Sequence, residues 1–470
     1  MISRADERQT HGFWLACLAA LTLLRLVLAG TLPLAPDEAY YWLWSRHLQA
    51  GYYDHPPMVA FFIRAGTLIF GPGALGIRLL GPLSMAAGSW LLWRAAEDFW
   101  PRRHAGLVAA GLFNATLLAG AAVLITPDTP LLLSWTAALA ILGRLVSGGD
   151  RRWWLGLGAA AGFALFSKYT GALLIAAVGL WLLTSPEGRR ELRSPWPWAG
   201  LALALLIFAP NLAWNATHDW VSYIKQGSRI AAFEPARASR FLAELLLGQI
   251  GLATPLVFGL MAAGVWRLAG LRSPPARLLL WMTLLPTGIF LEHGMFDRVQ
   301  ANWPAILYPG ACVAAGRLPE IVLARWLKPA LGLGFAVTLM VYLQCVTAVF
   351  PLPPARDPIA LQLAGWDRFS AALSAEHAAF VTADDYATAA ELAFHAPRGE
   401  AVAAFGARWR YLNLPGTRAL AGKSGILVTR REDVACPDQL GSLTRFSPRG
   451  PVMRYRLCRI AAMPDGSLLR

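Results

Sequence analysis

The sequence predicts an all-α membrane protein that crosses the bilayer many times, with a small α/β domain at its C-terminus. Of its 470 residues, 56% are hydrophobic and only 15% are charged, and the mean hydropathy is +0.46. A water-soluble domain usually carries about 25% charged residues. Apolar stretches long enough to span a bilayer recur between Phe13 and Phe350. The stretch 351–470 is polar throughout and contains no spanning run.

About eleven segments are candidates for transmembrane helices. They lie near residues 13–32, 77–96, 105–125, 130–146, 153–167, 170–184, 197–215, 241–266, 278–292, 303–316 and 329–350. The stretch 58–70 is apolar but brief, so a re-entrant or interfacial helix is an alternative to a span. Arg4 and Arg8 precede the first run, which is longer than a signal-peptide core and has no clean small-x-small cleavage site after it. We therefore expect a retained first helix.

The positions of lysine and arginine predict the orientation in the membrane. If the N-terminus is cytoplasmic, every loop on that side is basic, as the positive-inside rule requires. These loops contain Arg102, Arg103, Arg151, Arg152, Arg189, Arg190, Arg193, Arg272, Arg277, Arg317, Arg325 and Lys328. They also explain the net charge of +14 without nucleic acid, for which no binding module is visible. The tail and the first loop, 33–76, are then periplasmic, and the protein lies in the inner membrane.

The change of composition near residue 350 predicts a domain boundary. Residues 1–350 are expected to form a transmembrane catalytic domain, and 351–470 a separate α/β domain of a size that can bury its own core. Stretches such as "AAFVTADDYATAAELAFHA" and "SGILVTRRED" are typical of alternating short strands and helices. Cys436 and Cys458 lie in this tail. They could form a disulfide outside the cytoplasm, or remain free thiols.

Ionisable residues near membrane depth gather on the predicted periplasmic side. Such residues are costly near hydrocarbon and usually mark a functional site, although simple solvation in loops would account for part of the set. The set comprises Asp37, Glu38, Asp54, His55, Asp128, Lys168, His218, Asp219, Lys225, Arg229, Glu292, His293, Asp297 and Arg298.

The acids of this set have two interpretations each. Asp37 and Glu38 directly follow the first predicted helix and could act as a general base or hold a cation. The alternative is a helix N-cap, since "PDEAYYWLW" places Asp37 just before a helical run. Asp128 is the only acid of the short hairpin "TPDTP". It could belong to a functional site, or it could cap the helix that starts near Pro130.

The basic residues on this side suggest a phosphate ligand. Lys168 interrupts the apolar run "LFSKYTG", where snorkelling to the interface is the alternative. The loop 215–240 contains Lys225 and Arg229 on the side where the positive-inside rule disfavours them. A lipid-linked phosphate would explain both, because lysine and arginine make charge-assisted hydrogen bonds to phosphate oxygens. A nearby carboxylate could then deprotonate an acceptor hydroxyl as the phosphate leaves.

Several motifs in order resemble one family. "PDEAYYWLWSRHLQAGYYDHPPM", "RLLGPLS", "ITPDTPLLLSW", "SKYTG" and "ANWPAILY" are similar to the bacterial branch of the protein-mannosyltransferase superfamily, multi-pass transferases of the GT-C type. The resemblance is to aminoarabinose-to-lipid-A and rhizobial lipid A galacturonosyltransferases, over roughly residues 10–310. The tail stretch "VTADDYATAAELAFHAP" also resembles tails of this group. The family implies a sugar donor on polyprenyl phosphate, a lipid, glycan or protein acceptor, and extracytoplasmic transfer, usually with inversion.

The resemblance implies roles for individual residues. Asp37, with Glu38 beside it, matches the first catalytic acid, and Asp128 matches the second, near which some members hold a divalent metal ion. No cofactor is otherwise implied; the expected metal ligands are Asp37 and Asp128. The remaining predicted site residues are Asp54, Tyr169, Glu292 and Asn302.

One position departs from the family pattern. Asp54 and His55 match an acid–lysine pair of the aminoarabinose enzymes, in which the lysine contacts the donor phosphate. Neutral histidine is a weaker phosphate ligand than lysine. Either Lys168, Lys225 or Arg229 therefore supplies the charge alongside His55, or the donor differs.

A transporter or flippase of a lipid-linked sugar is the alternative function. Transporters often contain two inverted halves with interrupted helices in matching positions. The sequence shows no such repeat. The concentration of acids and bases on one side favours chemistry over alternating access.

Overall fold

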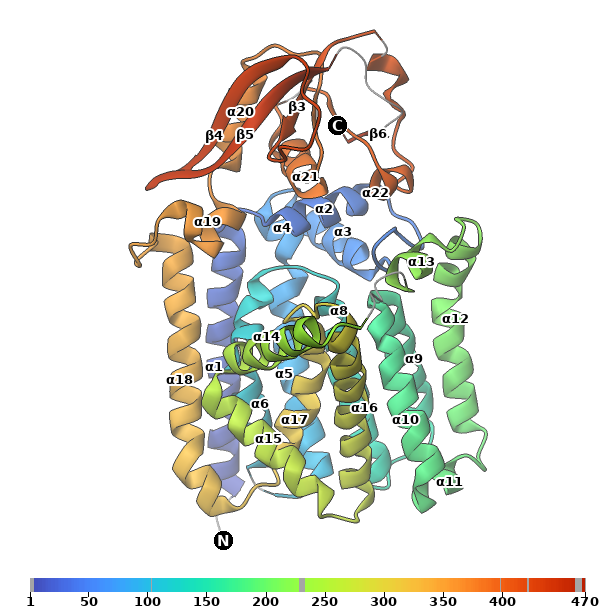
Figure 1. Cartoon of the computed structure of the whole chain (residues 1–470). Helices are drawn as coiled ribbons and strands as arrows, with labels where there is room; N and C mark the ends of the chain where they lie inside the picture. The colour runs from blue at the N-terminus through green and yellow to red at the C-terminus, as the bar shows by residue number, and fades with distance from the viewer. Residues whose placement is uncertain are drawn as a thin grey trace. The chain divides into compact units, whose positions relative to one another are not determined.

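The computed structural model describes residues 4–102, 104–227, 233–397, 399–420, 422–460 and 467–469 (Figure 1). Two compact units are present. The first, here called the helical unit, comprises Met1–Ala29, His55–Val59 and Arg78–Met340. The second, the mixed unit, comprises Gly30–Asp54, Ala60–Ile77 and Val341–Arg470. Most of the first loop thus groups with the tail, while the division of the chain at residue 350 stays a prediction.

The described helices confirm a polytopic, mainly α-helical protein. Six are long and apolar enough to cross a bilayer, and two bent pairs raise the number to eight if each pair is one span. The six are α1 (Arg4–Thr31), α5 (Leu80–Phe99) with α4 (Ala74–Arg78), α8 (Asp128–Val146), α12 (Trp196–Ala216), α16 (Pro274–Phe296) and α18 (Glu320–Thr347). Shorter apolar helices are α3 (Met58–Phe70), α9 (Trp153–Ser167), α10 (Ala172–Thr184) after η2 (Tyr169–Gly171), and α17 (Leu307–Ala315) after η3 (Trp303–Ile306).

Two predicted spans are bent instead of straight. Around residues 105–125, α6 (Ala105–Asn114) meets α7 (Leu117–Gly120) and η1 (Ala121–Val123) at 68°. Around 241–266, α14 (Pro235–Ala253) meets α15 (Pro255–Ala269) at 106°, and Figure 1 shows α14 lying across its neighbours. The cause is local, because Pro255 has no backbone N–H and Thr254 adopts a φ of 68°.

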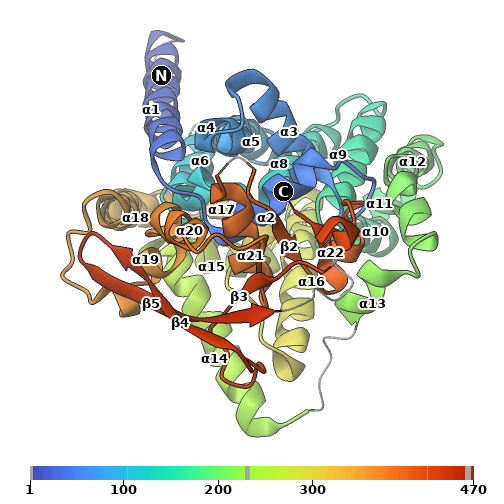
Figure 2. The same ribbon diagram turned by 90° about the horizontal axis from the view of Figure 1, so that it is seen from above.

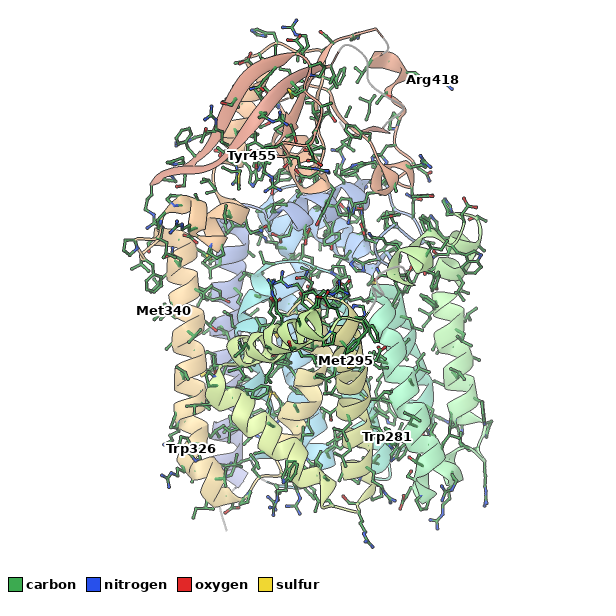
Figure 3. The ribbon with its side chains drawn as sticks, in the orientation of Figure 1. Trp281, Met295, Trp326, Met340, Arg418 and Tyr455 are labelled. Atoms are coloured by element: carbon green, nitrogen blue, oxygen red, sulfur yellow. A yellow bond between two sulfur atoms is a disulfide. The ribbon has the colours of Figure 1, made fainter. Side chains whose placement is uncertain are left out.

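Aromatic side chains mark one end of the helical unit. Trp281 on α16 and Trp326 on α18 lie toward the same end in Figure 3. The indole of Trp281 donates to the Thr184 hydroxyl at 2.9 Å. Tryptophan is enriched at membrane–water interfaces because its ring is apolar and its N–H is polar. This arrangement fits an aromatic belt at a membrane–water interface.

Glycine allows α9 and α12 to pack closely. A Cβ atom added to Gly158 would overlap the backbone carbonyl of Gly200, and one added to Gly200 would overlap that of Trp154. In membranes, small residues are favoured at helix interfaces because they let two backbones approach. The α9–α12 contact therefore holds in place the helix that ends at Lys168.

The mixed unit contains a six-stranded sheet, which confirms the predicted α/β tail. Its strands are β1 (Val381–Ala383), β2 (Val402–Ala404), β3 (Gly425–Thr429), β4 (Gln439–Ser447), β5 (Gly450–Ile460) and β6 (Ser467–Leu468). The order is β4-β5-β3-β1-β2-β6. Strands β2, β1 and β3 pair in parallel, and the other neighbours pair antiparallel. Figure 2 shows β4 and β5 as a long hairpin.

Burial explains the central strands and their helices. Each residue of β1, β2 and β3 is buried, as expected for parallel strands covered on both faces. Helices of this unit include α2 (Pro36–Arg46), α19 (Pro358–Leu363), α20 (Trp366–Ser374), α21 (Tyr386–His395) and α22 (Ala407–Arg410). Asp385 caps α21, since its carboxylate accepts from the Thr388 N–H at 2.9 Å.

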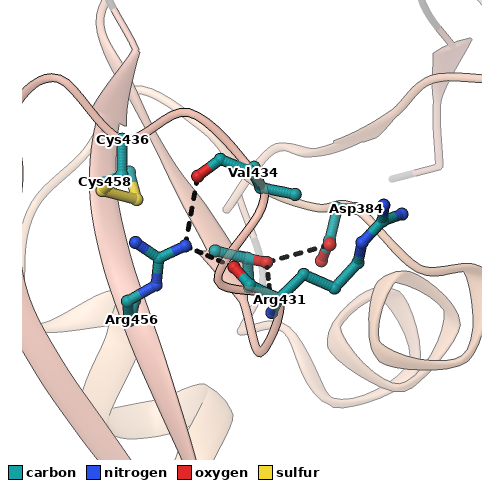
Figure 4. The surroundings of a disulfide bond; sticks show 7 residues. Asp384, Arg431, Val434, Cys436, Arg456 and Cys458 are labelled. Carbon is teal, nitrogen blue, oxygen red and sulfur yellow. Dashed lines mark hydrogen bonds between the residues drawn. A yellow bond between two sulfur atoms is a disulfide. The ribbon is translucent and has the colours of Figure 1, made fainter.

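Cys436 and Cys458 form a disulfide (Figure 4). Their Cα atoms are 5.3 Å apart, and 22 positions separate them along the chain. Next to the bridge, the Arg456 guanidinium donates to the carbonyl of Val434 at 3.1 Å. Of the two alternatives that the sequence leaves open, the structure contains the bonded pair, which is the form found in oxidising compartments.

We predict that Gly158→Val destabilises the protein by about 3 kcal/mol, because its side chain would collide with the backbone of α12. Gly179→Val is the matched control on neighbouring α10, since a Cβ at Gly179 has no heavy atom within 4 Å. Thermal unfolding of both variants in detergent checks this. Equal melting temperatures for Gly158→Val and Gly179→Val would contradict the proposed helix contact.

Candidate active site

The helical unit contains a buried charged cluster around Asp128. Asp128 begins α8 and is 7% exposed; Lys168, directly after α9, is 6% exposed. The Lys168 ammonium contacts Oδ1 of Asp128 at 2.7 Å. The amide of Asn302 donates to Oδ2 at 2.7 Å. Three segments that are distant in sequence therefore meet at one carboxylate, and both of its oxygens are hydrogen-bonded.

The environment of Asp128 does not suit a divalent metal ion. Its two nearest partners, Lys168 and Asn302, are N–H donors, whereas Mg²⁺ and Ca²⁺ require oxygen ligands. Among the described residues, no group of three or more His, Cys, Asp or Glu side chains could hold a metal. We therefore assign no step of the chemistry to a metal at Asp128.

A second polar cluster follows directly on Lys168. The Tyr169 hydroxyl lies 3.5 Å from Oδ1 of Asn211 and accepts from Nδ2 of Asn215 at the same distance. Asn211 and Asn215 are fully buried on α12. The Tyr223 ring lies 5.0 Å from that of Tyr169. These contacts tie the turn that carries Lys168 to α12 and to α13 (Val221–Gly227).

In the mixed unit, the acids of the first loop differ in exposure. Asp37 is exposed at the start of α2, and its Oδ1 accepts from the Tyr386 hydroxyl at 2.7 Å. Glu38 is 1% exposed, and its carboxylate accepts from the Ala35 N–H at 2.9 Å. The sequence offered Asp37 as the cap of this helix, but Glu38 performs that role. Asp37 keeps a carboxylate that a substrate can reach.

Asp54 is held by two residues of the same unit, Arg408 and Tyr40. Its Oδ2 accepts from Nε of Arg408 at 2.7 Å, and its Oδ1 accepts from Nη2 at 3.3 Å. The Tyr40 hydroxyl also donates to Oδ2, at 3.0 Å. The Arg408 guanidinium lies 4.2 Å from the centre of the Tyr386 ring, within cation–π distance. Asp54 and Asp37 are thus joined through Arg408 and Tyr386.

These neighbours also shift proton affinities. Although Asp37 is open to solvent on one side, the protein atoms packed around its carboxyl displace part of its water and raise the pKa of Asp37 above its ordinary value; the charges of Asp54 and Glu38 add to this. The Tyr386 hydrogen bond and the Arg408 charge lower the pKa of Asp37 in part. Burial raises the pKa of Tyr386 further above neutrality, so its hydroxyl stays a donor. The raised pKa of Asp37 is closer to neutral pH, where a general base is most effective.

The other predicted residues are placed as follows. His55 is half-buried and belongs to the helical unit, whereas Asp54 belongs to the mixed unit. Lys225 is half-buried on α13, and Glu292 is exposed on α16. Arg229 lies outside the described residues. Lys168 and Asn302 are thus the predicted residues that the structure brings to Asp128.

The sequence did not single out Tyr40, Tyr386 or Arg408. Tyr386 does lie in the tail stretch "VTADDYATAAELAFHAP", which marks the region but not the residue. Arg408 is one of several arginines in the tail and is part of no motif. Its role depends on a turn after β2, which sequence spacing alone does not connect to Asp54.

Comparison with known proteins agrees with this architecture. Residues 54–214 match the family described as dolichyl-phosphate-mannose-protein mannosyltransferase. ArnT from Cupriavidus metallidurans, solved bound to undecaprenyl phosphate, aligns with a TM-score of 0.65 at 16% identity, over 96% of this chain and 99% of that one. The chain has the GT-C fold. The resemblance to GT-C glycosyltransferases that the sequence predicts is confirmed.

Two curated relatives are similar in sequence. Lipid A galacturonosyltransferase RgtD of Rhizobium johnstonii is 29% identical over 306 residues, 64% of this chain and 63% of that protein. Lipopolysaccharide core galacturonosyltransferase RgtA of the same organism is 29% identical over 258 residues, 52% of this chain and 50% of that protein. The similarity thus covers less than two thirds of the length of either relative.

We predict that Lys168→Met lowers stability by about 3 kcal/mol, because it leaves the Asp128 carboxylate buried without its cation. The double variant Lys168→Met, Asp128→Leu should recover most of this loss, since it removes both charges. Lys328→Met, at an exposed position on α18, is the control. Thermal unfolding in detergent measures all three variants. A wild-type melting temperature for the single variant Lys168→Met would contradict the proposed contribution of the Lys168–Asp128 pair to stability.

Proposed function

We propose that this protein is a membrane glycosyltransferase that moves a sugar from a polyprenyl-phosphate donor to a lipid acceptor of the lipid A type. The observation that carries the proposal is an exposed carboxylate, Asp37, held by the Tyr386 hydroxyl in a chain with the GT-C fold. The relatives named above act on lipid A or on lipopolysaccharide core. The likeness to an ArnT bound to undecaprenyl phosphate supports a lipid-linked donor.

Asp37 is the general base of the proposed reaction. Its carboxylate accepts the proton of the acceptor hydroxyl while that oxygen attacks the anomeric carbon of the donor sugar. The bond between the anomeric carbon and the phosphate oxygen breaks, and polyprenyl phosphate leaves with the electron pair. A single displacement of this kind inverts the configuration at the anomeric carbon. The raised pKa of Asp37 suits proton acceptance near neutral pH.

Lys168 and Lys225 are the proposed cations for the donor phosphate. Lys168 shares its charge with Asp128 but has further N–H groups for an anionic oxygen. Lys225 is half-buried on α13, which also carries Tyr223 against the ring of Tyr169. Developing negative charge on the leaving phosphate is stabilised best by donors fixed in advance. The contacts of Asp128 with Lys168 and Asn302 supply this fixation.

We further propose that the transfer takes place on the periplasmic face of the inner membrane. The basic loops support this orientation through the positive-inside rule. The disulfide between Cys436 and Cys458 supports an oxidising compartment for the tail. Galacturonic acid is the first sugar to test, because both curated relatives are named for its transfer.

We predict that Asp37→Asn and Asp128→Asn each lower the rate of sugar transfer by about 100-fold or more, since a lost general base or a misplaced lysine removes a contribution of that size. Purified protein is supplied with polyprenyl-phosphate-linked galacturonic acid and lipid A, and mass spectrometry detects the modified lipid.

Asp219→Asn is the matched control, because Asp219 is exposed with a φ of 54°, a conformation that asparagine tolerates. It should transfer at the wild-type rate. Full activity of Asp37→Asn would refute the assignment of the base. If no lipid is modified by the wild-type protein or in cells that overproduce it, the proposed activity is wrong.

A further inference from the structure

The tail sheet presents two side chains from the carboxyl ends of neighbouring parallel strands. Tyr386 begins α21, shortly after β1, and Arg408 lies in α22, shortly after β2. In α/β sheets, ligands bind at this edge because the loops after the strands converge there. Gly406, with a φ of 106°, makes the turn that sends Arg408 out of the sheet. The partner at this edge is the first loop of the same chain.

Both side chains reach carboxylates of the first loop. The Tyr386 hydroxyl donates to Asp37 at 2.7 Å, and Arg408 binds Asp54 with two hydrogen bonds. The stacking of Arg408 on the Tyr386 ring also fixes these two tail residues relative to each other. A bidentate contact specifies orientation as well as distance.

Apolar contacts hold the tail against the first loop, independently of these polar groups. The Trp42 ring packs edge-on against Phe394 at 5.0 Å, and Tyr40 packs against Trp409 at 5.4 Å. Figure 1 shows α21 and α22 facing α2 within the mixed unit. The Asp54–Arg408 ion pair, in which Arg408 is partly exposed, adds little net stability beyond such contacts. The hydrogen bonds of Tyr386 and Arg408 therefore have another role than holding the tail and the first loop together.

We propose that Tyr386 and Arg408 are positioning residues for the transfer reaction: Tyr386 orients the Asp37 carboxylate, and Arg408 fixes Asp54 and the Tyr386 ring behind it. This inference rests on the proposed function of Asp37 as the base. It makes the C-terminal domain part of the catalytic machinery and not only an appended module.

The geometry at Asp37 determines the test. The Tyr386 hydroxyl holds one carboxylate oxygen of Asp37, Oδ1, at 2.7 Å. Without this hydrogen bond the carboxylate is no longer held in one orientation, so the rate of transfer in the bound complex falls while binding of the lipid-linked donor is unchanged.

Tyr386→Phe is the first variant, since it keeps the ring beneath Arg408 and against Tyr40 at 5.1 Å. Transfer of galacturonic acid from polyprenyl phosphate to lipid A is measured as kcat and as the KM for the donor. The kcat should fall about tenfold with the KM unchanged, because a misplaced catalytic group slows the reaction without weakening donor binding. An unchanged kcat, or a loss confined to the KM, overturns the role of Tyr386.

Arg408 is tested by conservative rescue. Arg408→Ala should lower kcat/KM about tenfold, and Arg408→Lys should recover part of it, because a cation again meets Asp54. Arg410→Ala is the control on the same helix, at an exposed position, and should match wild type. An Arg408→Lys variant no better than Arg408→Ala overturns the role of Arg408.

The same assay separates this inference from the proposed function. If Asp37→Asn is inactive while Tyr386→Phe has the wild-type kcat, Asp37 remains the base and the positioning role of Tyr386 is wrong. If Asp37→Asn is fully active, the proposed function of Asp37 itself is wrong.

Discussion

The ion pair between Asp54 and Arg408 is the contact on which the orientation of the polar groups at Asp37 depends. It joins a residue of the first loop to a residue 354 positions later in the chain. Arg408 in turn lies over the Tyr386 ring, whose hydroxyl meets Asp37. A single guanidinium therefore determines where two carboxylates and one tyrosine lie. The aromatic contacts of α2 with α21 and α22 hold these segments together beside it.

In the helical unit, residues of that unit likewise fix the position of an acid. Asp128 is buried where an uncompensated charge would be very costly, and a lysine and an asparagine satisfy it. Close glycine packing between α9 and α12 keeps the lysine-bearing turn in place. Each unit thus presents acids whose positions are determined by partners from distant segments. Preorganised polar groups of this kind are what group transfer at a membrane surface requires.

Periodicity and composition predicted the polytopic helical fold, because bilayer-spanning helices need long apolar runs that are visible in any sequence. The α/β tail was also predictable, since its strands and helices alternate in composition. The bends at Thr254 and near Ala115 were not, because a hydropathy window does not respond to a single backbone conformation. The pairing of Cys436 with Cys458 stayed open, since spacing cannot show which cysteines approach each other.

For the site, the sequence led to Asp37, Asp128 and Lys168 because each interrupts an apolar context. It suggested Asn302 only through a family motif. It missed Arg408 and Tyr386, which lie in a polar tail where charged and aromatic residues are common. The sequence also treated Asp37 and Glu38 alike, whereas burial separates them: one is exposed and the other caps a helix. Long-range partners of this kind follow from topology, and local pattern does not reveal them.

The most direct test is a double-mutant cycle on Asp54→Asn and Arg408→Gln, with kcat/KM for transfer of galacturonic acid to lipid A as the measured quantity. If the two residues act as one unit, each single variant should lose activity, and the double variant should lose scarcely more than the worse of the two. Fully additive losses would contradict the account, because they would mean that Asp54 and Arg408 affect transfer independently.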